Sequence, residues 1–211
     1  MADGPLRVVV LVSGSGSNLQ SLIDTVHAPG GDIEIVLVVS SKPGVPAIER
    51  AERAGIPTTA IGLAGRQREE RDRELAGVVA AAAPGLVVLA GWMSILTGAF
   101  LDRFPDRVIN LHPSLLPSFP GMHAIEEALA WGVKVTGVTV HYAEEVVDGG
   151  PPILQEPVPV LYGDDADSLT SRIREVEHRL VPEAVRLFAA GRVIRDGADR
   201  RKVQIVPLEV E

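Results

Sequence analysis

The chain has 211 residues, of which 46% are hydrophobic and 23% charged, as in a folded globular protein rather than a disordered one. It carries 28 acidic and 20 basic residues and only 4% aromatic residues. This composition argues against nucleic acid as a main partner, because little positive charge or stacking surface is available. Cysteine is absent, which excludes disulfides, a thiolate nucleophile and Cys-ligated metals and fits a cytoplasmic protein.

The first half of the chain alternates between apolar runs and helical segments. The predicted strands cover residues 7–12, 33–39, 56–60, 86–90 and 108–110. Helices are predicted between them, at about residues 18–27, 46–55 and 66–83. This alternation predicts a Rossmann-like α/β fold, in which a mostly parallel sheet has helices on both faces.

Two stretches within this half need separate interpretation. The start of the 66–83 helix is charged, and its Arg68–Asp72 and Glu69–Arg73 pairs stand four residues apart, which favours an exposed helix with ion pairs. The uncharged stretch from Leu75 to Leu101 is long enough to cross a membrane. Because Pro84-Gly85 interrupts it, we expect a helix, a turn and a buried strand, and no membrane partner.

The second half predicts an antiparallel extension of the sheet. Residues 133–142 and 153–160 indicate two longer strands, separated by a turn-rich loop. A helix is predicted over residues 168–190 because apolar residues recur there at three- and four-residue spacing. Pro182 is expected to kink or split this helix, and the tail after Gly191 is expected to hold a short strand or two.

The segment Gly14-Ser-Gly-Ser-Asn18 joins the first strand to the first helix. Glycines allow the backbone to approach an anion, and the free N–H groups of a helix N-terminus bind it. Leu19 replaces the third glycine of a dinucleotide fingerprint, and no Lys-Ser/Thr pair follows as in a Walker loop. The segment therefore favours a single-phosphate site, and the alternative is a plain turn capped by Ser17.

Asn110 and His112 stand two apart at the end of a predicted strand, so both side chains face the same way. An amide that donates to an oxyanion beside an imidazole that moves a proton suits acyl transfer. The alternatives are a strand-ending turn for Asn110 and a buried, hydrogen-bonded histidine for His112.

Three further polar residues are candidates. Asp148 precedes two glycines and forms either an ordinary turn or a carboxylate that orients a histidine, and the sequence does not place it near His112. His141 ends a strand and either lines a cleft or packs. Glu177 borders the apolar stripe of the last helix and is either functional or a solvated edge residue. No metal-ligand spacing is present, so no metal is expected.

Four motifs in chain order resemble a known family. They are V-S-G-S-G-S-N-L-Q, A-G-W-M-S-I-L, I-N-L-H-P-S-L-L-P, and G-V-T-V-H-Y with V-D-G-G-P. Together they resemble the phosphoribosylglycinamide formyltransferases, folate-dependent enzymes of purine biosynthesis, from Arg7 to about Ala190. The resemblance implies one formyltransferase domain over residues 1–211. Within it, residues 7–110 form a nucleotide-binding half and residues 111–190 a catalytic and folate-binding half.

The resemblance also implies roles for individual residues. The implied catalytic residues are Asn110, His112 and Asp148. Those implied to bind the ribonucleotide phosphate are Ser15, Gly16, Ser17 and Asn18, and Glu177 would contact the glycinamide end. Those implied to line the folate site are Arg68, Leu89, Met93, Ser94, Ile95, Leu96 and Asn110. Ser15 and Ser94 depart from a relative that has Asn and Arg at these positions.

The implied reaction transfers the formyl group of 10-formyltetrahydrofolate to the amine of glycinamide ribonucleotide, without a metal. In that reaction Asp148 would stabilise the imidazolium form of His112. The expected partners are these two small molecules, and the expected state is a monomer or a homodimer. The alternatives are a formyltetrahydrofolate hydrolase and a non-catalytic nucleotide-binding module. Formylation of Met-tRNA would require a further nucleic-acid-binding domain.

Overall fold

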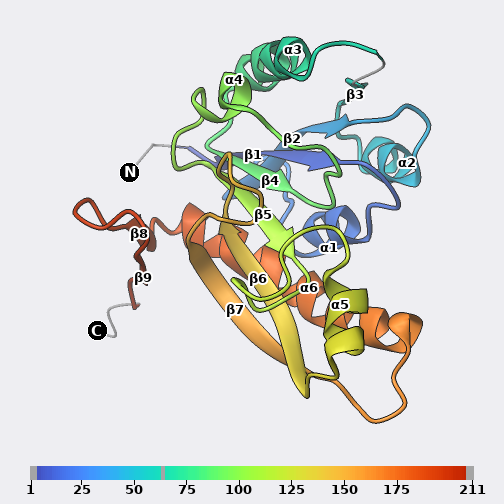
Figure 1. Cartoon of the computed structure of the whole chain (residues 1–211). Helices are drawn as coiled ribbons and strands as arrows, with labels where there is room; N and C mark the ends of the chain where they lie inside the picture. Colours follow the sequence, from blue (N-terminus) through green and yellow to red (C-terminus); the bar gives the residue numbers. More distant parts are fainter. Residues whose placement is uncertain (1–3, 63–64, 208–211) are drawn as a thin grey trace.

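The computed structural model describes residues 4–62 and 65–207. Its centre is a seven-stranded sheet in the order β3-β2-β1-β4-β5-β6-β7 (Figure 1). The strands are β1 (Leu6–Val12), β2 (Ile33–Ser40), β3 (Thr58–Ala60), β4 (Leu86–Leu89), β5 (Val108–His112), β6 (Val135–Tyr142) and β7 (Pro152–Pro159). β1 to β5 are parallel, whereas β6 and β7 pair antiparallel. The predicted fold class, with its antiparallel extension, is confirmed.

Helices cover both faces of the sheet and explain its apolar strands (Figure 1). On one face lie α1 (Ser17–Thr25), α2 (Pro46–Arg53) and α6 (Ala166–Ala189). On the other lie α3 (Arg68–Ala81) and the short α4 (Gly98–Leu101). Val8 and Val10 of β1 face the first layer, and Val9 and Leu11 face the second. Because side chains alternate along a strand, burial of both faces requires an unbroken apolar run.

The long helix α6 runs through Pro182 without a break, so the predicted split is wrong. Proline has no N–H, which leaves the carbonyl oxygen of residue 178, four positions earlier, without its helical donor. The Ser21 hydroxyl of α1 donates to this oxygen of His178. A hydrogen bond from the neighbouring helix therefore replaces the one that Pro182 cannot make. α5 (Ala124–Trp131) packs beside α6.

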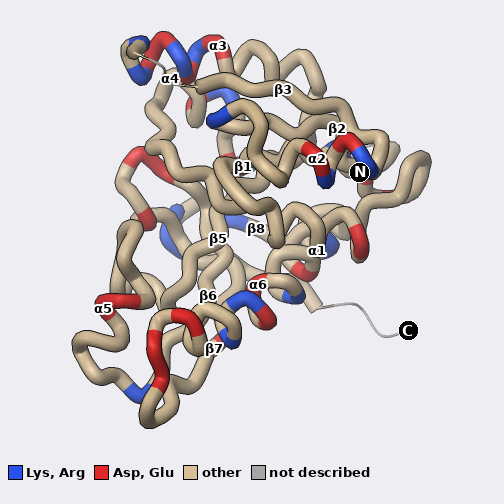
Figure 2. The backbone as a smooth tube through the Cα atoms, turned by 90° about the vertical axis from the view of Figure 1, so that its right-hand side faces the viewer, with Lys and Arg blue, Asp and Glu red and all other residues tan. Residues whose placement is uncertain are grey.

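The charged start of α3 differs from the prediction of an exposed helix. Acidic and basic residues alternate along this helix (Figure 2), and Glu69 pairs with Arg73 at 3.1 Å as predicted. Asp72, however, is completely buried and pairs with the equally buried Arg71 rather than with Arg68. Four-residue spacing does not reveal which side of the helix packs against the protein.

The tail after residue 191 forms a two-stranded antiparallel hairpin, β8 (Val193–Arg195) and β9 (Val203–Ile205). Arg195 connects the hairpin to the sheet, since it pairs with Asp106 and Glu144 and lies 5.1 Å from the ring centre of Tyr142. Burial, helped by the charge of Asp106, raises the pKa of Tyr142 to about 12. Within residues 4–62 and 65–207, no helix has the length and apolar character needed to cross a membrane.

Candidate active site

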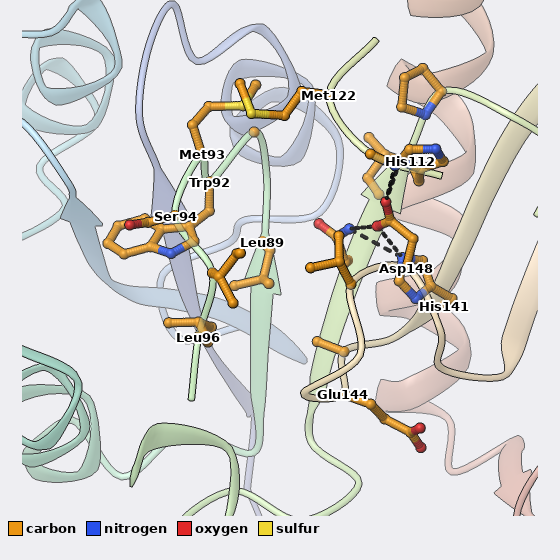
Figure 3. A pocket seen from close by; sticks show the side chains of 18 of the residues that line it. Leu89, Trp92, Met93, Ser94, Leu96, His112, Met122, His141, Glu144 and Asp148 are labelled. Atoms are coloured by element: carbon orange, nitrogen blue, oxygen red, sulfur yellow. Dashed lines mark hydrogen bonds and ion pairs between the residues drawn. The ribbon is translucent and has the colours of Figure 1, made fainter. Parts of the chain in front are cut away.

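A cavity of about 270 Å³ opens at the carboxyl ends of β4 and β5, where ligands gather in open α/β sheets. One side is formed by the segment that follows β4, and the other by β5, β6 and the loop after β6. In Figure 3, Leu89, Trp92, Ser94 and Leu96 lie opposite His112, His141 and Asp148. The cavity thus has an apolar wall, which includes residues 89–96, and a polar wall.

The strand register places the polar wall. Asn110 and His112 both line the cavity, as their spacing on β5 predicted, while the side chain of Leu111 joins the core on the opposite face. His141 of β6 pairs directly with Asn110 in the antiparallel register. Residues opposite one another share a face of the sheet, so the side chain of His141 reaches Asn110, with 3.1 Å between Nε2 and Nδ2. The sequence left open whether His141 lines a cleft or packs.

Asp148 reaches this wall through a tightly closed loop. The backbone N–H of Tyr142 donates to the carbonyl of Pro151 at 3.1 Å, which brings the two ends of the loop together. A side chain at position 150 would lie 1.8 Å from the carbonyl oxygen of Tyr142, so only glycine fits there. Asp148 itself has φ of 52°, a left-handed conformation that Asp tolerates better than most residues.

The Asp148 carboxylate joins the three polar side chains. Its Oδ2 lies 3.4 Å from Nδ1 of His112 and accepts the N–H of Gly121 at 2.8 Å. Its Oδ1 lies 3.4 Å from Nδ2 of Asn110 and 3.6 Å from Nε2 of His141. Asp148, which the sequence did not place near His112, therefore lies beside it (Figure 3) and forms one cluster with His112 and Asn110.

This environment keeps Asp148 ionised. Burial by itself raises the pKa of the Asp148 carboxyl, but hydrogen bonds from His141 and Gly121 and the charges of both histidines outweigh it, so the pKa lies below its ordinary value. Nε2 of His112 lies 2.8 Å from the carbonyl oxygen of Phe119, while Nδ1 faces Asp148. Both ring nitrogens therefore face acceptors, and a protonated imidazole can donate to both.

The loop after β1 forms a second polar site. Gly16 is the N-cap of α1, with φ of 71° and no side-chain cap, so the alternative of a turn capped by Ser17 is wrong. The first N–H groups of a helix have no acceptor within the helix, which leaves those of Ser17 and Asn18 for an anion. Nδ2 of Asn18 donates to Oε2 of Glu177 at 3.1 Å. Two predicted substrate residues, distant in sequence, are thus in contact.

The predicted folate residues fall into two groups. Six of them line the cavity: Leu89, Met93, Ser94, Ile95, Leu96 and Asn110. Arg68 is exposed at the first position of α3 and is not among the lining residues. The structure adds lining residues that no polar motif marked, namely Trp92, Leu101, Met122, Glu144 and Val147. Trp92 lies in the A-G-W-M-S-I-L motif, which assigned it no role. The other four resemble ordinary core and surface residues, so the sequence held no signal for them.

Ser13, which directly follows β1, links the ends of β1 and β2 to the apolar wall. Its hydroxyl oxygen accepts the N–H of Met93 at 2.9 Å and the hydroxyl of Ser41 at 2.6 Å. The ends of β1 and β2 are thereby tied to the segment after β4. The sequence placed Ser13 next to the glycine loop but gave no sign of these contacts.

Comparisons with known proteins show the family to which the chain belongs. Residues 6–185 match the family model described as formyl transferase. The chain is 43% identical to phosphoribosylglycinamide formyltransferase of Escherichia coli, over 89% of each chain. It is 44% identical to glycinamide ribonucleotide transformylase 1 of Symbiobacterium toebii, whose crystal structure superposes with a TM-score of 0.91 over 96% of this chain and 95% of that one.

A human relative is larger. The chain is 46% identical to the trifunctional purine biosynthetic protein adenosine-3 of Homo sapiens, over 89% of this chain, but it spans only 19% of that protein. The chain belongs to the formyl transferase family and, within it, to the phosphoribosylglycinamide formyltransferases.

Proposed function

We propose that this chain is an enzyme that transfers the formyl group of 10-formyltetrahydrofolate to the amine of glycinamide ribonucleotide. The products are formylglycinamide ribonucleotide and tetrahydrofolate, a step of de novo purine biosynthesis. The observation that carries this proposal is the contact of one carboxylate, Asp148, with both His112 and Asn110 at 3.4 Å, beside an apolar cavity wall. These groups match the needs of acyl transfer between nitrogen atoms.

Each polar residue has a role in this reaction. The amine nitrogen attacks the formyl carbon, a carbon–nitrogen bond forms, and negative charge builds on the formyl oxygen. The amide of Asn110 donates a hydrogen bond to that oxygen. The positive charge of a protonated His112, whose two ring nitrogens face Asp148 and the carbonyl of Phe119, stabilises the same oxygen electrostatically. The bond to the folate nitrogen then breaks. His112 mediates transfer of the proton lost by the amine to this nitrogen, and Asp148 stays ionised and stabilises the imidazolium.

The ribonucleotide lies against the loop after β1. Backbone N–H groups of Ser15, Gly16, Ser17 and Asn18 hold the phosphate at the start of α1. Oδ1 of Asn18 is buried and has no hydrogen-bond partner among the described residues, and it lies beside the carboxylate of Glu177. Two acceptors at this point suit the donor groups of the substrate, its amine and its ribose hydroxyls.

The folate lies against the apolar wall. Leu89, Ile95 and Leu96 offer a surface for a flat ring system, and pockets for such groups are lined in this way. Arg68 lies outside the cavity, where it contacts only a part of the ligand that projects outward. We propose that the chain acts as a monomer or homodimer on these two small molecules, in the cytoplasm.

One assay separates this function from its alternatives. The purified chain is incubated with 10-formyltetrahydrofolate, with and without glycinamide ribonucleotide, and tetrahydrofolate, formate and the formylated ribonucleotide are quantified. We expect tetrahydrofolate only when the ribonucleotide is present, in equal amount to the formylated product. Formate release without the ribonucleotide would identify a hydrolase. No release in either case, with the ribonucleotide bound, would identify a binding module.

A further inference from the structure

Helix α3 buries two adjacent charged side chains behind the apolar wall of the cavity. Arg71 and Asp72 are both 0% exposed, and Nε of Arg71 donates to Oδ1 of Asp72 at 2.5 Å. Neither residue lines the cavity. Burial of a charged pair is costly unless its remaining hydrogen-bonding groups are satisfied. The hydrogen-bond partners of the two side chains therefore indicate which part of the structure the pair stabilises.

Apart from their mutual bond, both side chains bind the segment between β4 and α4. Nη1 of Arg71 donates to the hydroxyl of Ser94 at 3.0 Å, and Nη2 donates to the carbonyl of Ile95 at 3.2 Å. The guanidinium also lies 5.5 Å from the ring centre of Trp92, a cation–π distance. Oδ2 of Asp72 accepts the backbone N–H of Thr97 at 2.7 Å and its hydroxyl at 2.8 Å.

This segment, residues 92–97, buries Trp92 and Leu96 in the core but has little backbone support. Among the residues that the structure describes, positions 92–96 form no backbone–backbone hydrogen bond. The side chains of Met93 and Ile95 are 66% and 45% exposed. The segment is held by the Ser13 hydroxyl at Met93 and by the Arg71–Asp72 pair. Its conformation, and with it the apolar wall, depends on side chains from other elements.

Arg71 also fixes the direction in which Ser94 can donate. A serine hydroxyl has one proton and two lone pairs. Because Nη1 of Arg71 is a donor that occupies one lone pair of Ser94, the hydroxyl proton must point elsewhere. Ser94 lines the cavity, so this hydroxyl can serve as a donor to a carbonyl or ring-nitrogen acceptor of a ligand there.

We propose that Arg71 and Asp72 are positioning residues for the folate co-substrate. They hold residues 92–97 against α3, keep Trp92 and Leu96 at the cavity, and leave the Ser94 hydroxyl as a donor to the folate ring. The planar fork of the guanidinium is required, because lysine cannot bind Asp72, Ser94 and Ile95 in the same directions. This inference rests on the proposed function in one respect, that the cavity takes the folate.

Kinetics of folded variants test the inference. Arg71→Lys retains the charge without the fork, and the double variant Arg71→Met/Asp72→Asn removes both charges and avoids an unpaired buried carboxylate. We expect the KM for 10-formyltetrahydrofolate to rise about tenfold in either variant, while kcat and the KM for the ribonucleotide change less than about threefold. Arg73→Met, an exposed residue of the same helix, is the matched control and should change none of them.

Tryptophan fluorescence gives a second measurement that does not need activity. The chain has two tryptophans, and Trp131 is 79% exposed whereas Trp92 is 8% exposed. In a Trp131→Phe background, emission comes from Trp92 alone. We expect Arg71→Lys and the double variant to shift this emission to the red as Trp92 becomes hydrated, and Arg73→Met to leave it unchanged.

The outcomes distinguish this inference from the proposed function. If the wild-type chain does not formylate the ribonucleotide, the proposed function fails, and the Trp92 emission alone decides whether the pair positions the wall. If the wild-type chain is active, an unchanged KM for the folate in the Arg71 variants overturns the inference, whatever the emission. An equal fold change in kcat and in the KM values for both substrates would also overturn it, because such a change indicates general loosening of the protein.

Discussion

The two walls of the cavity are held in place by different means. Except for Asp148, which lies on a closed loop, the polar wall stands on regular strands, where the pairing of Asn110 with His141 fixes both side chains to one face. The apolar wall is irregular, and side chains of Ser13, Arg71 and Asp72 fix it instead. Catalytic groups need closely controlled geometry, which regular elements provide best. We therefore expect changes in the polar wall to lower turnover, and changes around the binding surfaces to raise KM.

The largest effect is expected from His112→Ala. Loss of this proton-transfer group should lower kcat on the order of a hundredfold to ten-thousandfold, and Asn110→Ala should cost about a hundredfold as a lost oxyanion donor. Steady-state kinetics measure the loss in kcat, and circular dichroism shows whether each variant is folded. His123→Ala, an exposed histidine at the start of α5, is the control. Near-normal turnover in a folded His112→Ala protein would remove His112 from the mechanism.

Asp148→Asn is expected to have the next largest effect on turnover. Asn tolerates the left-handed backbone, so the variant should fold, yet it no longer stabilises imidazolium, and kcat should fall on the order of a hundredfold. A variant as active as the wild type would show that the carboxylate charge is not used.

The same substitution tests the electrostatics of the polar wall. In the folded protein the pKa of Asp148 lies below its ordinary value of 3.8. A lowered pKa stabilises the folded state fully above the unfolded value, and this contribution is lost as the pH falls through the folded value. In urea unfolding, the stability of the wild type relative to Asp148→Asn should fall as the pH is lowered from about 5 through 3.8 and below. A relative stability that is unchanged in acid would contradict the lowered pKa.

Gly16→Val should act mainly on ribonucleotide binding. Position 16 has φ of 71°, and a Cβ there would lie 2.7 Å from Cβ of Ala47, so the phosphate loop must shift. We expect the KM for glycinamide ribonucleotide to rise about tenfold or more, with little change in the KM for the folate. Gly14→Ala, in the same loop with no atom within 4 Å of an added Cβ, is the control, and Ser15→Ala should be mild. If the variant loses folate binding instead, the two substrate sites have been assigned the wrong way round.

Arg68→Ala should have the smallest effect. An exposed cation outside the cavity forms at most a surface ion pair, worth about 1 kcal/mol or less, so the KM for the folate should rise no more than about fivefold. The measurement is the KM for 10-formyltetrahydrofolate at low and at high salt. A rise well beyond this limit would mean that Arg68 binds the folate more strongly than an exposed ion pair does.

Local sequence patterns predicted most of the sheet. The unbroken apolar run of β1 signals a strand with two buried faces, and the spacing of Asn110 and His112 predicts a shared face, because both follow from the two-residue period of a strand. The motifs at residues 12–20 and 109–117 also indicated the enzyme family. The role of each site residue stays a prediction that the variants above test.

What the sequence determined by itself was most of the strands, the longer helices, the glycine turn and the placement of Asn110 and His112 on one face of a strand. Each of these features depends on neighbours along the chain. Tertiary structure alone decided that Asp148 meets His112, that Asn18 meets Glu177 and that His141 joins the polar wall. It also decided that Asp72 is buried with Arg71. An acidic residue has the same sequence pattern on an exposed and on a buried helix face, and only the packing of α3 against residues 92–97 distinguishes the two.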